Sequence, residues 1–191
     1  MAMRRGFKAW CERAADSYRA ALQTPLDQQL DPEQLANHLG VEVWCPEDVP
    51  DMPAESLRHL TEDGRDDWSA VTIRVGKLHL TIVNSSHAVN RQRSSITHEL
   101  SHIILDHEPS RIDISAAGHL LLNSFDKNQE AEADWLSGTL LVPREGLRKA
   151  FASVNDPASL AQRFGVSVDM LQWRIRMTGV AAQARRAGRY R

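Results

Sequence analysis

The stretch His98-Glu99-Leu100-Ser101-His102 decides the fold, because it places an H-E-x-x-H pattern inside a segment with helical periodicity, residues 95–106. On an α-helix, residues four positions apart lie on the same face, one turn from each other. His98 and His102 can therefore direct two imidazole rings at one cation, with Glu99 beside them to act on a water molecule there. The pattern predicts a zinc-binding helix that also carries a catalytic base.

A second predicted helix, from Asn128 to a stop at Pro143, supplies acidic residues with a matching spacing. A catalytic zinc takes three protein ligands and leaves one position open. Glu130 can be the third ligand, and Asp134, four residues later on the same face, can accept the spare ring N–H of a liganding histidine. Glu132 points roughly 160–200° away from both. The alternative is a solvated acidic face near a helix N-terminus, where acids are favoured.

The two helices together resemble the ImmA/IrrE family of zinc metallopeptidases, a gluzincin-type arrangement in which H-E-x-x-H is followed by E-x-x-x-D. The strong match covers Arg91–Leu105 and Glu130–Pro143, and a weaker match covers Asp31–Val41. Two departures are visible: Leu136-Ser137 stands where the family usually has Phe-Ala, and Val142 replaces a usual Met. Both concern packing and leave the metal set intact.

This resemblance implies a peptidase in which Zn²⁺ is held by His98, His102 and Glu130, with Glu99 as the base and Asp134 supporting a ligand. It also implies a cytoplasmic protein whose substrate is a helix-turn-helix repressor, cut to induce mobile-element or stress-response genes. An alternative from another class is a non-catalytic module that binds a repressor or DNA around a structural or vestigial zinc. The intact Glu99 argues against it, because a structural site needs no base. No residue of the sequence identifies the donor for the oxyanion.

Composition limits the remaining choices. The chain has 191 residues, a net charge of −2 and 42% hydrophobic residues, which is typical of a globular domain and not of a protein that coats nucleic acid. It has no long apolar run for a membrane span or a secretory signal. The two cysteines, Cys11 and Cys45, lack any metal-binding spacing, so we interpret them as free thiols of a reducing cytoplasm.

The expected fold class is α+β: a mostly helical, zincin-like domain with a small sheet of about three strands and a C-terminal helix-turn-helix-like pair. Alternating patterns predict strands at 41–44, 70–75 and 78–83, the last two joined by a hairpin at Gly76-Lys77. The edge of this sheet could bind an extended peptide, or the hairpin could only pack the core. Residues 46–69 suggest an irregular connection. The insert from Glu108 to Phe125 is either a lid or an apolar packing segment.

We expect three regions: a zinc metallopeptidase domain (1–152), helix-turn-helix-like helices packed on it (153–180) and a disordered basic tail (181–191). The helix pair could read a DNA major groove through Arg174 and Arg176, but a structural pair or a repressor-docking surface is favoured. His107 lies about 140° from the His102 face of a continuing helix and is expected to be exposed.

Overall fold

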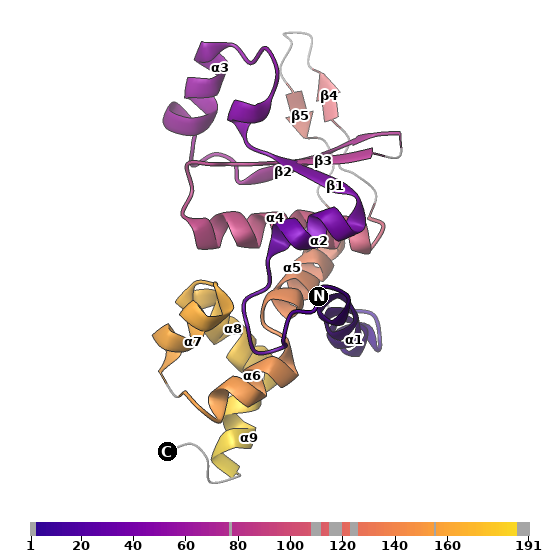
Figure 1. Cartoon of the computed structure of the whole chain (residues 1–191). Helices are drawn as coiled ribbons and strands as arrows, with labels where there is room; N and C mark the ends of the chain where they lie inside the picture. Colours follow the sequence, from indigo (N-terminus) through magenta and orange to yellow (C-terminus); the bar gives the residue numbers. More distant parts are fainter. Residues whose placement is uncertain are drawn as a thin grey trace.

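The computed structural model describes residues 3–76, 78–107, 112–114, 120–122, 126–154 and 156–186. The fold class is as expected, a mostly helical α+β fold with a small sheet at one end (Figure 1). The helical segments before the pentad are α1 (Phe7–Ala21), α2 (Pro32–Leu39), the 3₁₀ turn η1 (Pro46–Asp48), α3 (Ala54–Arg58) and the π-helical turn η2 (His59–Asp63). The later helices are α4 (Val89–Ile104), α5 (Lys127–Leu141), α6 (Arg144–Phe151), α7 (Pro157–Phe164), α8 (Val168–Thr178) and α9 (Val180–Arg186).

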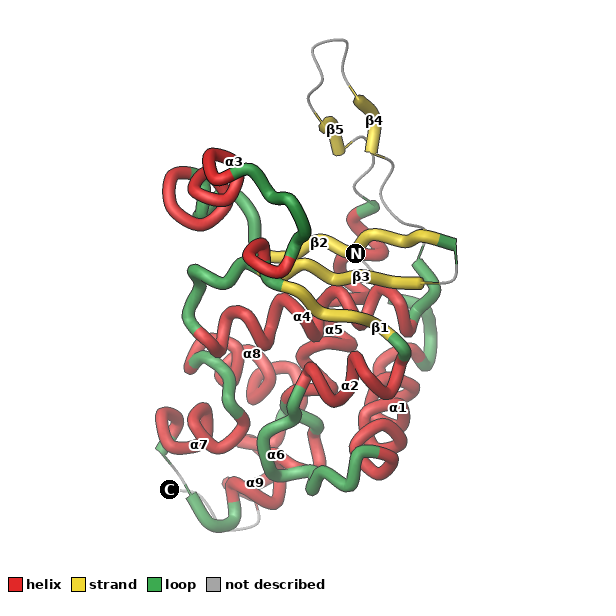
Figure 2. Tube along the Cα trace, turned by 45° about the horizontal axis from the view of Figure 1, so that its top comes forward, coloured by secondary structure: helices red, strands yellow, loops and turns green. Residues whose placement is uncertain are grey.

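The predicted strands β1 (Val41–Trp44), β2 (Ala70–Val75) and β3 (Leu78–Val83) form one mixed sheet in the order β1-β3-β2. The central strand β3 pairs in parallel with β1 and antiparallel with β2. Gly76 adopts a φ of 63° at the predicted hairpin turn, a conformation that favours glycine. The sheet lies against α4, with β2 at its edge (Figure 2).

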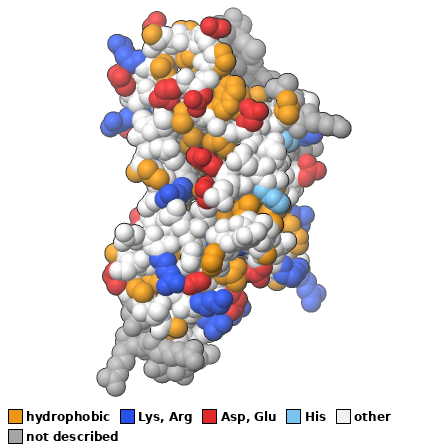
Figure 3. All heavy atoms as spheres, viewed as in Figure 1, with side chains coloured by type: hydrophobic (Ala, Val, Ile, Leu, Met, Phe, Trp, Pro, Cys, Tyr) orange, Lys and Arg blue, Asp and Glu red, His pale blue; other side chains and the backbone are white. Residues whose placement is uncertain are grey.

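The segment between β1 and β2 differs from the expectation of an irregular connection. It contains η1, α3 and η2, and Trp68 donates its indole N–H to the carbonyl of Leu60, which ties the end of the segment back to η2. Its sequence is rich in acidic residues, and Figure 3 shows acidic side chains mixed with basic and hydrophobic ones over the upper part of the molecule. Of the insert 108–125, the structure describes β4 (Ile112–Ile114) and β5 (Leu120–Leu122), which pair antiparallel. The other residues of the insert lie outside the described part, so the two alternatives for it stay open.

Two buried clusters stabilise the chain. The first joins α1, α2, the sheet, α4 and α5, and it includes Leu100 and Leu136, both fully buried. The second begins at Leu141 and joins α6, α7, α8 and α9. Because α5 contributes to both clusters, it connects the sheet-bearing half to the C-terminal helices. The end of the metallopeptidase domain at residue 152 remains a prediction. Helix α6, which lies before it, packs with the helices that follow.

The end of α5 is held by buried arginines from distant segments. Arg19 of α1 donates to the carbonyls of Leu140 (3.0 Å) and Leu141 (2.9 Å), and Arg174 of α8 donates to that of Val142 (3.0 Å). Burial lowers the pKa of Arg19 to about 10, so its guanidinium stays charged at neutral pH. These bonds satisfy carbonyls that the end of a helix otherwise leaves unpaired.

Arg174 is fully buried and Arg176 is exposed, so the DNA-reading alternative, which was not favoured, loses one of its two residues. The expectation of a disordered tail needs correction. Residues 180–186 form α9, which buries Val180 in the second cluster, so this part of the expected disordered tail is helical. Residues 187–191 lie outside the described part. Among the described helices, none combines the length and apolar character that a membrane crossing requires.

Candidate metal centre

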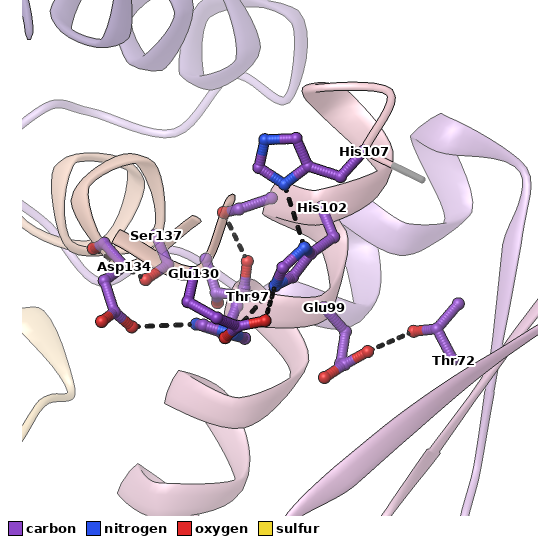
Figure 4. A network of polar contacts seen from close by, with 10 residues as sticks. Thr72, Thr97, Glu99, His102, His107, Glu130, Asp134 and Ser137 are labelled. Atoms are coloured by element: carbon purple, nitrogen blue, oxygen red, sulfur yellow. Dashed lines mark hydrogen bonds and ion pairs between the residues drawn. The ribbon is translucent and has the colours of Figure 1, made fainter. Parts of the chain in front are cut away.

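The pentad helix and the acidic helix pack against each other and bring three side chains together (Figure 4). Nε2 of His98 lies 3.1 Å from Nε2 of His102 and 3.2 Å from Oε2 of Glu130. Nε2 of His102 lies 3.5 Å from Oε1 of the same carboxylate. The three ligand atoms lie within 4.8 Å of one another. The group that the sequence predicted as a ligand set is thus gathered from two helices.

Hydrogen bonding around His98 makes this group suited to a metal cation. Oδ1 of Asp134 lies 3.1 Å from Nδ1 of His98, and a carboxylate can only accept, so Nδ1 carries the ring proton. In the neutral ring Nε2 then presents a lone pair towards the other ligand atoms. Two nitrogens bound to one tetrahedral zinc lie about 3.3 Å apart, close to the observed 3.1 Å. Two imidazoles and one carboxylate are the donor set of many catalytic zinc sites.

The two histidines titrate differently. Burial lowers the pKa of His102 to about 4, with a further lowering from the charges of His98 and His107. Burial also opposes the charged form of His98, but the hydrogen bond and the charge of Asp134 outweigh it and raise the pKa of His98. His102 is therefore neutral at pH 7, the form in which imidazole binds a metal.

Glu99 occupies a separate position beside the ligand group. Its Oε2 accepts a hydrogen bond of 2.6 Å from the hydroxyl of Thr72 on β2 (Figure 4). That hydroxyl also lies 3.0 Å from Oγ1 of Thr81 on β3. Burial raises the pKa of Glu99, and the Thr72 hydrogen bond and the charge of His98 partly oppose this shift. A carboxylate anchored through one oxygen keeps its other oxygen for proton transfer.

Sequence reasoning missed three residues of this region. Thr72 was not singled out, although the β2 alternation places it on the face that meets α4. His107 was expected to be exposed, which is wrong: its side chain is 6% exposed, and Nδ1 lies 3.0 Å from Nδ1 of His102. Asp106 has a φ of 51°, so the helix has ended and helical geometry no longer places His107. Glu132, which the sequence analysis did not favour as a metal ligand, lies beside His107.

Comparison with known proteins identifies the family of the chain. The family described as the IrrE N-terminal-like domain (Peptidase M78) matches residues 54–176, and the chain belongs to this family. The match confirms the ImmA/IrrE resemblance, and the family suggests a zinc metallopeptidase.

No curated protein matches the chain. Among solved structures, a Mycobacterium tuberculosis transcriptional regulator is similar with a TM-score of 0.48 and 14% identity, over 91% of this chain and 47% of that one. The chain therefore spans about half the length of that regulator.

Proposed function

We propose that this protein is a zinc-dependent endopeptidase that cleaves a helix-turn-helix transcriptional repressor and so induces mobile-element or stress-response genes. The observation that carries the proposal is the gathering of His98, His102 and Glu130 beside the half-buried Glu99. The family supports the peptidase class. The repressor as substrate rests on the resemblance to ImmA/IrrE proteins.

In this proposal His98, His102 and Glu130 hold the zinc ion. When bound, zinc supplies Lewis-acid chemistry, which makes a water molecule more acidic and polarises a substrate carbonyl. Glu99 accepts a proton from the attacking water and delivers it to the amine that leaves when the peptide C–N bond breaks. Burial raises the pKa of Glu99, which suits a group that must both accept and donate a proton. Asp134 keeps the proton of His98 on Nδ1.

The sheet edge offers a place for the substrate. Strand β2 pairs only with β3 in the described part of the chain, so its other edge has backbone groups available for an extended peptide. Thr72 of β2 contacts Glu99, so a peptide on this edge would pass next to the base. This placement supports an extended substrate segment presented to the metal site.

The alternative is a binding module that sequesters the repressor without cutting it. The test is co-expression with a helix-turn-helix repressor encoded beside this protein's gene, with wild type, Glu99→Gln, Glu130→Gln and the control Glu42→Gln. Glu42 is an exposed residue of β1. Zinc content is measured by elemental mass spectrometry, and repressor cleavage by intact-mass analysis.

We expect about one zinc per wild-type chain, and the same in Glu42→Gln. Glu99→Gln should keep the zinc and lose cleavage by about 10²-fold or more. Glu130→Gln should lose zinc and activity together. If Glu99→Gln induces transcription of the repressed target genes as strongly as wild type does, the protein is a binding module instead. Full zinc affinity in Glu130→Gln would place the third ligand elsewhere.

A further inference from the structure

The ring of His102 has a second contact, on the side away from the ligand group. Its Nδ1 lies 3.0 Å from Nδ1 of His107, and the His107 side chain is 6% exposed (Figure 4). The two rings meet edge-on, with centroids 5.0 Å apart. His98 is supported directly by a carboxylate, Asp134, whereas the neighbour of His102 is another imidazole.

Two facing imidazole nitrogens can share only one proton, so this contact couples the tautomers of both rings. If His107 donated, the proton of neutral His102 would sit on Nε2 and point into the ligand group. If His102 donates instead, its Nε2 presents a lone pair to the metal, and His107 carries its own proton on Nε2. The second arrangement is the one that a metal ligand requires.

Glu132 favours that second arrangement. Its Oε2 lies 3.5 Å from Nε2 of His107, a buried atom that has no hydrogen-bond partner among the described residues. A carboxylate at this position attracts the proton to Nε2 of His107. Arg4 donates to both oxygens of Glu132, from Nε at 3.0 Å and Nη2 at 2.9 Å, and such a bidentate pair fixes the carboxylate.

We propose that His107, Glu132 and Arg4 form a positioning array that holds His102 in the tautomer and orientation needed for metal binding. The proposal rests on the metal site of the proposed function. The array gives His102, through His107, the carboxylate support that His98 receives directly from Asp134. None of its three members touches the reacting atoms, so they are positioning residues.

The test measures metal affinity of the full chain by competition with a chromogenic chelator for Zn²⁺, together with the visible spectrum of the Co²⁺-loaded protein. His107→Leu removes the acceptor, whereas His107→Asn, of nearly the same size, keeps an amide oxygen near the position of Nδ1. Glu132→Gln removes the charge with little change in shape. The controls are His38→Leu and Glu42→Gln, both at exposed positions of other elements.

We expect His107→Leu to bind Zn²⁺ about 10–100-fold more weakly and with an altered Co²⁺ spectrum, and His107→Asn to regain most of the affinity. Glu132→Gln should lose about tenfold, and the controls nothing. Wild-type affinity in His107→Leu or in Glu132→Gln would overturn the array, and so would equal losses in the Leu and Asn variants, since packing alone would then explain them.

The wild type and His98→Ala separate this proposal from the underlying function. If the wild type binds Zn²⁺ tightly and His98→Ala does not, normal binding in the His107 variants refutes the array alone. If the wild type itself binds no Zn²⁺, the metal site fails, and the array falls with it. Thermal melting of each metal-free variant checks that the fold is retained, and Glu132→Gln tests the array if His107→Leu does not fold.

Discussion

The fully buried Arg174 should contribute strongly to the stability of the fold, because its guanidinium joins α8 to α1 and to the end of α5. Its Nε donates to the carbonyl of Val142, and its Nη2 lies 2.8 Å from Oε1 of Glu12 on α1. Arg174→Met keeps most of the aliphatic stem and removes both interactions. The carbonyl of Val142, a fully buried residue, then loses its charged donor.

The expected cost follows from these contacts. Breaking a buried ion pair by removing one partner costs about 3–5 kcal/mol, and a hydrogen bond to a charged group contributes about 1.5–3 kcal/mol. Glu12 is 27% exposed, so water can solvate it after the change, and Nη1 of Arg174 is a buried donor without a partner among the described residues. Both facts reduce the loss. We expect a decrease in unfolding free energy of about 3 kcal/mol, or roughly 6–12 °C in Tm.

The assay is urea and thermal unfolding of chelator-treated protein followed by circular dichroism, with Arg176→Met as the matched control. Arg176 lies on the same helix and is exposed, so its substitution should change stability by less than about 0.5 kcal/mol. If the two variants are equally stable, the buried arginine does not join α8 to α1, and the reasoning fails. The DNA-reading alternative would be restored if the wild type binds DNA tightly and Arg174→Met, but not Arg176→Met, abolishes that binding without a loss of stability.

Three further predictions concern single positions. Because burial raises the pKa of Glu99, its ionised form destabilises the folded state. Metal-free Glu99→Gln should therefore have a higher Tm than wild type at pH 7.5, and the difference should vanish near pH 4. A lower Tm of the variant at pH 7.5 would contradict this. Asp134→Ala should weaken Zn²⁺ binding about 10–100-fold in chelator competition; unchanged affinity would remove its supporting role. Gly146→Ala places a Cβ 1.9 Å from the carbonyl oxygen of Leu26, so urea unfolding should register a loss of about 1–3 kcal/mol, and unchanged stability would refute this contact.

Much of the fold could be predicted from the sequence where a local signal sets the structure. The helical period around the pentad predicts a helix from near Val89 to Asp106, and α4 runs from Val89 to Ile104. Asp126 caps α5 by accepting from the backbone N–H of Asn128. The β2–β3 hairpin followed from alternation around a Gly-containing turn. Spacing also put Glu130 and Asp134 on one face and gave Glu130 as the third ligand, and the family resemblance implies the same residue.

The parts that could not be predicted depend on contacts between distant segments. Nothing local indicates that Arg174 turns inward, since its partners Glu12 and Val142 are 162 and 32 residues away. His107 was misplaced because a single left-handed residue, Asp106, redirects the chain after α4. Its contact with Glu132, in turn, exists only because α4 and α5 pack together.

These long-range contacts also bear on how the site is kept in place. Glu130 sits in the first turn of α5, and the last turn of that helix is held by Arg19, while Arg174 holds the residue that follows it. A ligand on a helix that is fixed at its far end can keep its distance from α4. The C-terminal helices therefore support the candidate metal site through α5, although none of their described side chains is a predicted ligand. The burial of Arg174 therefore favours the structural alternative for the helix-turn-helix-like pair, as expected from the sequence.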